Sequence, residues 1–579
     1  DPLHTVPWGN FVSSTVHGKS AKLTIKTEVR NDGDAARNCR VTSRILDKSG
    51  RGVATAQSKR MTVSPGANVE FTSETTIGNP ALWSIEQPNL YRAITTVEAE
   101  TNVTDSIETP FGVRTIRFDP DRGFFLNDQP VKMKGTCNHQ DHAGVGAALP
   151  DRLQYYRIER LKDMGSNAYR ASHNPPTPEL LDACDGLGML VMDETRLMSS
   201  NPEGLSQLSR LIRRDRNHPS VVLWSLGNEE REQGTERGAQ IVATMKRLVR
   251  QLDPTRPVTV AMNGAWGKGV SNVVDVQGFN YGNAGGRGGD LAAKNIDDFH
   301  AKFPKQPSVG SETASSFFTR GVYVTDKEKG HISAYDVNFP GYANGTEGWW
   351  KTYAARPFVA GGFAWTGFDY RGEPSPYAWP CISSHFGILD TCGFPKDIFY
   401  YYRSWWDKQP VLHLFPHWNW RGREGQEIDV WCYTNLPRVE LFLNGKSLGV
   451  KKVEENSHLE WKVPYAPGVI EAVATGGSKE LKSARETTGA PAKLTLRADR
   501  QKIAANGEDV SVVTVEVLDD KGRTVPTANN LVSFKLDGPA RLIGVGNGDP
   551  SCHEDDKPSS AHEAKRSLFN GLAMVLVQS

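Results

Sequence analysis

The sequence has few cysteines and no pair of them at the spacing of a metal knuckle. Its 579 residues include 7 cysteines, an odd number with no Cys-x-x-Cys. The sequence therefore predicts neither a zinc knuckle nor a dense disulfide framework. We expect most of these residues to be free thiols. A pair between Cys381 and Cys392 stays open, since connectivity cannot be deduced from spacing.

The sequence also has no excess of one charge and no long apolar run. Lysine and arginine number 68 against 67 aspartates and glutamates, which gives a formal net charge of +1. Nucleic-acid binding and polyelectrolyte disorder usually require a stronger imbalance. No stretch approaches the roughly 20 apolar residues of a membrane span. The composition predicts an ordinary soluble globular protein with no nucleic-acid partner and no membrane span, and it leaves homo-oligomerisation open.

The amino terminus, Asp1-Pro2-Leu3-His4, has no initiator methionine and no charged segment followed by an apolar one. We therefore expect the chain to lie within a longer product or to follow its processing. We expect a periplasmic or secreted location rather than a cytoplasmic one.

Four segments of different hydrophobic pattern follow one another. Residues 1–115, 411–488 and 489–579 carry short alternating apolar and polar runs between turn clusters, which predicts β-sandwiches. In residues 116–410 apolar runs alternate with helix-like segments, which predicts a catalytic (β/α)8 TIM barrel. The fold class is therefore multidomain, a TIM barrel flanked by immunoglobulin-like β-sandwich domains, the last of bacterial Ig-like appearance. Barrel strands are expected at Val131–Lys134, Asn167–Arg170, Met189–Asp193, Val221–Leu226, Pro257–Ala261, Val273–Val276, Pro307–Val309 and Gly361–Trp365, with helices at Arg152–Met164 and Gln240–Leu252.

Two of the expected barrel strands end in a glutamate, Glu229 and Glu312. Barrel enzymes place their catalytic groups at the carboxyl ends of strands. The two glutamates are 83 residues apart, an interval that three βα units of about 30 residues predict, so they belong to the fourth and seventh strands. Retaining glycoside hydrolysis needs a carboxylic acid and a carboxylate about 5–5.5 Å apart. The spacing alone therefore places both glutamates at the same end of the barrel, where such a pair of groups would be needed.

The residues before Glu229 resemble a signature of glycoside hydrolase family 2, the family of β-galactosidases, β-glucuronidases and β-mannosidases. Asp215–Glu229 reads DRNHPSVVLWSLGNE, and shorter family segments occur as KGTCNHQD at Lys134–Asp141 and NAYRASHNP at Asn167–Pro175. The resemblance covers essentially the whole chain. It implies double displacement through a covalent glycosyl-enzyme, with Glu229 as general acid/base and Glu312 as nucleophile.

The resemblance also implies a set of sugar-binding side chains. Asn228 would bond the sugar 2-hydroxyl, Tyr281 would support the nucleophile, and Trp365 would be a stacking platform. Arg170 would keep Glu312 ionised by lowering its pKa. The implied substrate-binding residues are His139, Asp141, Arg170, His173, Asn228, Tyr281 and Trp365.

Other residues near these motifs have a structural interpretation. Asp193, Glu194 and Glu230 are expected to be structural acids, and His218, which precedes its strand, is expected to pack or to cap. The family pattern is also incomplete. The chain has no counterpart of the family's amino-terminal jelly-roll domain, and after Glu194 it lacks the residues that resemble magnesium ligands. We therefore predict no metal and no cofactor.

A β-galactoside or a related oligosaccharide is the expected substrate of an exo-acting enzyme. Family 2 β-glucuronidases carry an Asn-x-Lys element after the eighth strand, which residues 386–396 lack, while Asn444–Lys446 falls in an expected hairpin. Residues 368–377 resemble modular bacterial β-galactosidases. The alternatives are a β-glucuronidase or another family 2 β-glycosidase and, from another class, an inactive carbohydrate-binding protein. A binding-only barrel has no chemical need for both glutamates.

Overall fold

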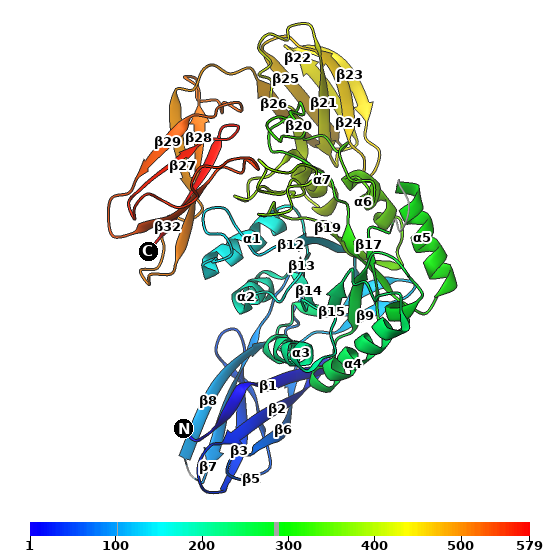
Figure 1. Cartoon of the computed structure of the whole chain (residues 1–579), viewed down its shortest axis with the longest axis vertical. Coiled ribbons are helices and arrows are strands. Elements are labelled where there is room, and N and C mark those ends of the chain that lie inside the picture. The colour runs from blue at the N-terminus through cyan, green and yellow to red at the C-terminus, as the bar shows by residue number, and fades with distance from the viewer. Residues whose placement is uncertain (101, 283–288) are drawn as a thin grey trace.

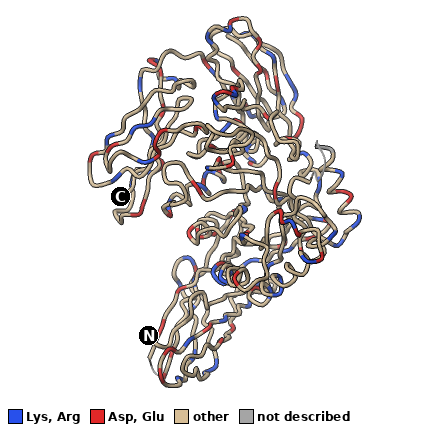
Figure 2. The backbone as a smooth tube through the Cα atoms, in the orientation of Figure 1, with Lys and Arg blue, Asp and Glu red and all other residues tan. Residues whose placement is uncertain are grey.

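A computed structural model of the chain describes residues 1–100, 102–282 and 289–579. A closed barrel lies in the middle of the molecule, with one β-sandwich on its amino-terminal side and two further β modules on the other (Figure 1). This arrangement confirms the predicted barrel and its flanking sandwiches. Charges of both signs are interspersed along the chain (Figure 2). Among the described helices, none combines the length and the apolar character that crossing a bilayer requires.

Eight parallel strands form the barrel, each pairing with the next in chain order and the last with the first. Their side chains are almost all buried, as their largely apolar sequences predict. The strands are β12 (Met133–Asn138), β13 (Ala168–Ala171), β14 (Leu190–Glu194), β15 (Val221–Asn228), β16 (Val258–Met262), β17 (Gln277–Asn280), β18 (Ser308–Thr313) and β19 (Val359–Trp365).

Helices lie between the strands and cover the outside of the barrel (Figure 1). Capping side chains set several of their starts: Thr177 Oγ1 accepts from Leu180 N, and Asn201 Oδ1 accepts from Gly204 N. The helices are α1 (Asp151–Asp163), α2 (Pro178–Leu187), α3 (Pro202–Asp215), α4 (Glu236–Leu252), the 3-10 helix η1 (Gly269–Asn272), α5 (Gly289–Lys302), α6 (Thr346–Ala354) and α7 (Asp397–Trp406).

The sixth barrel strand was expected at Val273–Val276 but begins directly after that run. Asp275 explains the difference, because its carboxylate accepts hydrogen bonds from Val258 N at 3.0 Å and Lys246 Nζ at 2.6 Å. Residues Val273–Val276 therefore connect η1 to β17 instead of forming the strand themselves. The strand itself, β17, buries polar residues and gives no apolar signal.

A small sheet that the sequence did not predict closes the amino-terminal end of the barrel. Phe124 and Leu126 pack in one cluster with Met133 and Phe363 of the barrel strands. Its strands are β9 (Ile116–Asp119), β10 (Gly123–Leu126) and β11 (Gln129–Val131), and β11 occupies the start of the run expected as the first barrel strand. The carboxyl ends of the strands lie at the opposite end of the barrel.

The amino-terminal sandwich packs two antiparallel sheets face to face. Alternation such as that of β2, where buried and less buried residues take turns, fixes which face is inward. One sheet contains β1 (Leu3–His17), β2 (Ser20–Asn31) and β6 (Asn68–Gly78); the other contains β3 (Arg37–Leu46), β4 (Gly52–Gln57), β5 (Met61–Val63), β7 (Tyr91–Ala99) and β8 (Asn102–Phe111).

Two β modules follow the barrel. In the first, Asn444 and Gly445 both have positive φ and join two strands by a two-residue turn, which confirms the expected hairpin. Its strands are β20 (Leu412–Phe415), β21 (Glu427–Thr434), β22 (Arg438–Leu443), β23 (Lys446–Lys452), β24 (Leu459–Pro464), β25 (Val469–Gly476) and β26 (Lys479–Glu486). The second, here called the C-terminal module, holds β27 (Lys493–Ala498), β28 (Val510–Leu518), β29 (Leu531–Lys535), β30 (Arg541–Gly546), β31 (Glu563–Ser567) and β32 (Leu572–Gln578).

The C-terminal module packs directly on the barrel beside α1 (Figure 1). Leu153 and Tyr156 of α1 share a hydrophobic cluster with Val512 and Leu576 of the module. All seven cysteines are free thiols, so the Cys381–Cys392 pair that the sequence left open is not formed. Cys381 Sγ instead lies 3.2 Å from Ser551 Oγ of the module.

Candidate active site

Polar side chains gather around one cavity at the carboxyl ends of the barrel strands. The cavity has a volume of about 480 Å³. Six of the residues predicted from the sequence line the cavity, Glu229 and Glu312 among them, together with four residues that were not predicted. The lining residues are His173, Asn228, Glu229, Asn263, Asn280, Tyr281, Glu312, Tyr342, Trp365 and Glu373.

Glu229 and Glu312 share one hydrogen-bond donor. Glu229 follows β15 and Glu312 lies in β18, the fourth and seventh strands of the barrel, as predicted. Asn280 Nδ2 lies 2.9 Å from Glu229 Oε1 and 3.3 Å from Glu312 Oε2, so these two oxygens lie no more than about 6 Å apart. Ser311 Oγ donates to Asn280 Oδ1 at 2.7 Å, which turns the amide nitrogen toward the glutamates.

Glu312 is buried and accepts hydrogen bonds on both oxygens. Arg170 Nη1 donates to Oε2 at 2.9 Å, and the Tyr281 hydroxyl donates to Oε1. Burial nevertheless raises the pKa of Glu312 above its ordinary value, against the lowering effects of Arg170 and Tyr281 and with a further raising effect from Glu229. Arg170 does lower this pKa, as expected, but desolvation of the carboxylate outweighs it, so the net shift is upward.

Arg170 lies behind the cavity wall rather than in it. Its side chain is fully buried and donates to Glu312, to Glu194 Oε2 at 2.8 Å and to Asn228 Oδ1 at 2.8 Å. Glu194 also accepts from Ser225 Oγ and binds His173 Nδ1 at 2.7 Å. Glu194 therefore positions the side chains that surround the two glutamates, which agrees with the expectation that it is a structural acid.

Aromatic rings form one wall of the site. The Trp365 ring stacks on the His173 ring at 5.3 Å between centroids, and the His139 ring meets the Trp365 ring edge-on at 5.4 Å. On its other side His139 packs on Tyr370 at 4.1 Å. Burial, with the nearby charges of His173 and Arg157, lowers the pKa of His139 to about 4, so this imidazole is neutral near pH 7.

Three of the predicted sugar-binding residues do not line the cavity: His139, Asp141 and Arg170. The carboxylate of Asp141 accepts from Arg371 N at 2.9 Å, in the segment after β19. Asp141 is therefore placed to hold that segment rather than a ligand in this cavity.

Four of the lining residues were not predicted from the sequence. Asn263 follows β16 and Asn280 ends β17, so both stand at strand ends where polar residues are informative. Tyr342 and Glu373 lie in long segments outside the strands, and no spacing or periodicity marked them.

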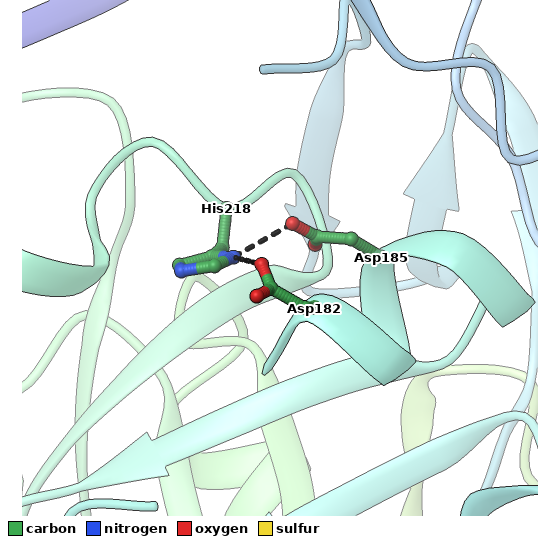
Figure 3. Close-up of side chains that lie close together, drawn as sticks. All are labelled: Asp182, Asp185 and His218. Carbon is green, nitrogen blue, oxygen red and sulfur yellow. Dashed lines mark hydrogen bonds and ion pairs between the residues drawn. The ribbon is translucent and has the colours of Figure 1, made fainter. Parts of the chain in front are cut away.

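One group of described residues has the make-up of a metal site, but it lies elsewhere. Asp182 and Asp185 of α2 converge on His218, which precedes β15 and therefore lies at the end of the barrel away from Glu229 (Figure 3). His218 Nδ1 lies 2.7 Å from Asp185 Oδ2, and Asp185 Oδ1 accepts from Ser220 N at 3.0 Å. These contacts engage His218 Nδ1 and both oxygens of Asp185, whereas Asp182 Oδ1 lies 4.0 Å from His218 Nδ1, and they agree with a packing role for His218.

Four family models match the chain. Residues 10–114 match "Glycosyl hydrolases family 2", and residues 120–205 and 198–379 match "Glycosyl hydrolases family 2, TIM barrel domain". Residues 494–579 match "Glycoside hydrolase family 2 C-terminal domain 5", and residues 425–482 match a domain of unknown function.

Relatives match over the full length of the chain. The β-galactosidase BoGH2A of Bacteroides ovatus is 38% identical, over 100% of this chain and 74% of that protein. A putative β-glucuronidase of Formosa agariphila is 32% identical, over 99% of this chain but 57% of that protein, so the chain spans less than two thirds of it. The crystal structure of a β-glycosidase from Bacteroides vulgatus superposes with a TM-score of 0.87 at 31% identity, covering 100% of this chain and 76% of that one.

Proposed function

This chain belongs to glycoside hydrolase family 2, and from that premise we propose that it is a retaining, exo-acting β-galactosidase that works by double displacement. The observation that carries the proposal is the shared contact of Glu229 Oε1 and Glu312 Oε2 with Asn280 Nδ2. An oxygen-to-oxygen separation of at most about 6 Å supports the short carboxyl spacing of retaining enzymes over the longer spacing, about 6.5–9.5 Å, of inverting ones.

In the first step Glu312 attacks the anomeric carbon as the bond to the leaving oxygen breaks. Glu229 gives its proton to that oxygen, and a glycosyl ester of Glu312 forms. Arg170 and Tyr281 hold the two oxygens of Glu312, so the attacking carboxylate is oriented before the sugar arrives.

In the second step water attacks the same carbon from the side that the leaving group left. Glu229, now a carboxylate, takes a proton from this water, and the ester bond to Glu312 breaks. Two inversions give net retention.

Asn228 completes the site: its Oδ1 accepts from Arg170, and its amide nitrogen lies near His173 on the cavity side, where it is placed to bond a sugar hydroxyl.

Two observations support a galactoside as substrate. The β-galactosidase BoGH2A is 38% identical over the whole chain, against 32% over 99% of the chain for a relative named a putative β-glucuronidase. The Asn-x-Lys element of the uronidases is absent from residues 386–396, and the similar triplet Asn444–Lys446 forms a hairpin turn in another module.

The test is hydrolysis of a panel of nitrophenyl β-glycosides, with proton NMR of the first sugar released. We expect the β-galactoside to have the highest kcat/KM and the sugar to appear first as the β-anomer. Release of the α-anomer would contradict retention. A glucuronide as best substrate would contradict the sugar assignment alone, and no turnover of any glycoside would favour a binding protein.

A further inference from the structure

We propose that Glu373 determines sugar specificity, by accepting a hydrogen bond from a hydroxyl of a neutral sugar and by repelling the carboxylate of a uronide. This inference rests on the proposed function and names the substrate class of the same site. Glu373 lies in the segment after β19 and lines the cavity with Glu229 and Glu312. It takes no part in the two steps described above.

The Glu373 carboxylate lines the cavity and has one oxygen engaged. The Tyr370 hydroxyl donates to Oε2, and among the described residues no other side chain or backbone group hydrogen-bonds to this carboxylate. Tyr370 is itself buried against His139 and Trp365, at 4.1 and 5.8 Å between ring centroids. The aromatic wall thus fixes the direction of Glu373, and Oε1 remains available as an acceptor.

The backbone at Glu373 is also unusual. Its φ is 31°, in the left-handed region that residues other than glycine rarely adopt. Glu229 and Tyr281, which line the same cavity, have φ of 53° and 59°. Backbone conformations of this kind persist where surrounding structure holds them, and they concentrate at functional sites.

The charges around the cavity favour a neutral sugar. The described lining residues include three carboxyl groups, those of Glu229, Glu312 and Glu373, and neither lysine nor arginine. The nearby cation, Arg170, is buried and already paired with Glu194 and Glu312. A uronide carboxylate would meet like charges in a site of low dielectric.

The segment that carries Glu373 is held from two sides. Arg371 N donates to Asp141, next to the first barrel strand, and Arg371 Nη2 lies 2.6 Å from Asp556 Oδ2 of the C-terminal module. Ile382 N donates to Pro550 O of that module at 2.9 Å. Asp141 therefore holds the segment that carries Glu373, a role that the sequence did not predict.

The test compares nitrophenyl β-D-galactoside with nitrophenyl β-D-galacturonide, which differ only in whether C5 bears CH2OH or carboxylate. We expect Glu373→Gln to lower kcat/KM for the galactoside by about 10-fold or more and to lower the galactoside-to-galacturonide ratio by at least about 10-fold, because it removes a charged acceptor and a repelling charge together. Glu373→Ala should lower the ratio similarly. Glu480→Gln, an exposed glutamate of β26, is the matched control and should leave both constants unchanged.

A structural role for Glu373 would lower both constants equally and leave the ratio unchanged, which overturns the inference. Where turnover of the galacturonide is too slow to measure, inhibition constants of free galactose and galacturonic acid give the same ratio. If the wild-type enzyme prefers the galacturonide or the glucuronide, the proposed function fails. If the wild-type enzyme prefers the galactoside and Glu373→Gln keeps the ratio, only the inference about Glu373 fails.

Discussion

Glu312 and Glu229 differ in their surroundings although both stand at the end of a barrel strand. Glu312 is buried and held by Arg170, Asn280 and Tyr281, whereas Glu229 is half-buried and faces the cavity. A fixed carboxylate suits attack on carbon, and a more accessible carboxyl suits proton exchange with the leaving group and then with water. The environments thus support the division of roles that we propose.

Replacing Glu312 by Gln should abolish turnover while the fold is kept. The amide is isosteric but cannot form the glycosyl ester, so kcat should fall by more than about 10⁴-fold. Nitrophenol release measures the loss, and circular dichroism checks the fold. Glu230→Gln is the neighbouring control, because Glu230 Oε1 accepts from Met198 N and has no role in either step. Wild-type rates in Glu312→Gln would remove this residue from the mechanism.

Replacing Glu229 by Ala should affect the two steps differently. Dinitrophenyl glycosides depart without a proton, so their first step should be nearly spared, whereas poorer leaving groups should be slowed by about 10²-fold or more. Deglycosylation should be slow for all substrates, and azide should restore it by giving a β-glycosyl azide. Without leaving-group dependence and azide rescue, the acid/base assignment would pass to Glu230.

The acid limb of the pH profile should lie above the range of an ordinary glutamate. Burial raises the pKa of Glu312, and the nucleophile works only when ionised, so kcat/KM should fall as the pH drops through this raised value. Tyr281→Phe removes a hydrogen bond that lowers the pKa, so it should move the acid limb to still higher pH. A limb that stays in place in Tyr281→Phe would contradict this account. Because the two glutamates interact, the profile reports values of the pair.

The two glutamates at strand ends were predictable, and the residues in the long segments were not. Glu229 follows β15 and Glu312 lies near the end of β18, so counting βα units was enough to bring them together. Glu373 and Tyr342 reach the cavity only because the segments that carry them fold back over the barrel mouth. That path depends on distant contacts, such as that of Arg371 with Asp556, which no local pattern reveals.

Among the elements, the barrel strands with apolar sequences were predicted to within a few residues. The strand β17, which begins and ends with a polar residue, was not predicted at its own residues. β17 consists of Gln277–Asn280, all buried, and its last residue, Asn280, lines the site and contacts both glutamates. At the other end of the strand the Gln277 side chain accepts from Ser271 Oγ of η1 and donates to Gly278 O. Hydrophobic patterning fails where a strand serves the site, because the positions that would be apolar carry the polar groups that orient the catalytic carboxylates.

The whole molecule is arranged so that the C-terminal module supports the mouth of the barrel. Arg320, in the segment after β18, donates to Asp390 Oδ2 at 2.6 Å and to the carbonyl oxygens of Asn547 and Phe569 in the module. Both Arg320 and Asp390 are buried. One guanidinium therefore joins two segments of the barrel mouth to two loops of the module.

Replacing Arg320 by Ala should weaken this junction strongly. The change leaves the buried Asp390 without its cation and removes the side-chain donor of Asn547 O and Phe569 O, which costs about 3–5 kcal/mol and should lower the midpoint of the module's thermal transition by roughly 10 °C or more. Differential scanning calorimetry measures the shift. Arg210→Ala, on the exposed face of α3 with a partner at 3.6 Å, should change the midpoint little. Equal shifts in the two variants would mean that Arg320 does not bind the module to the barrel.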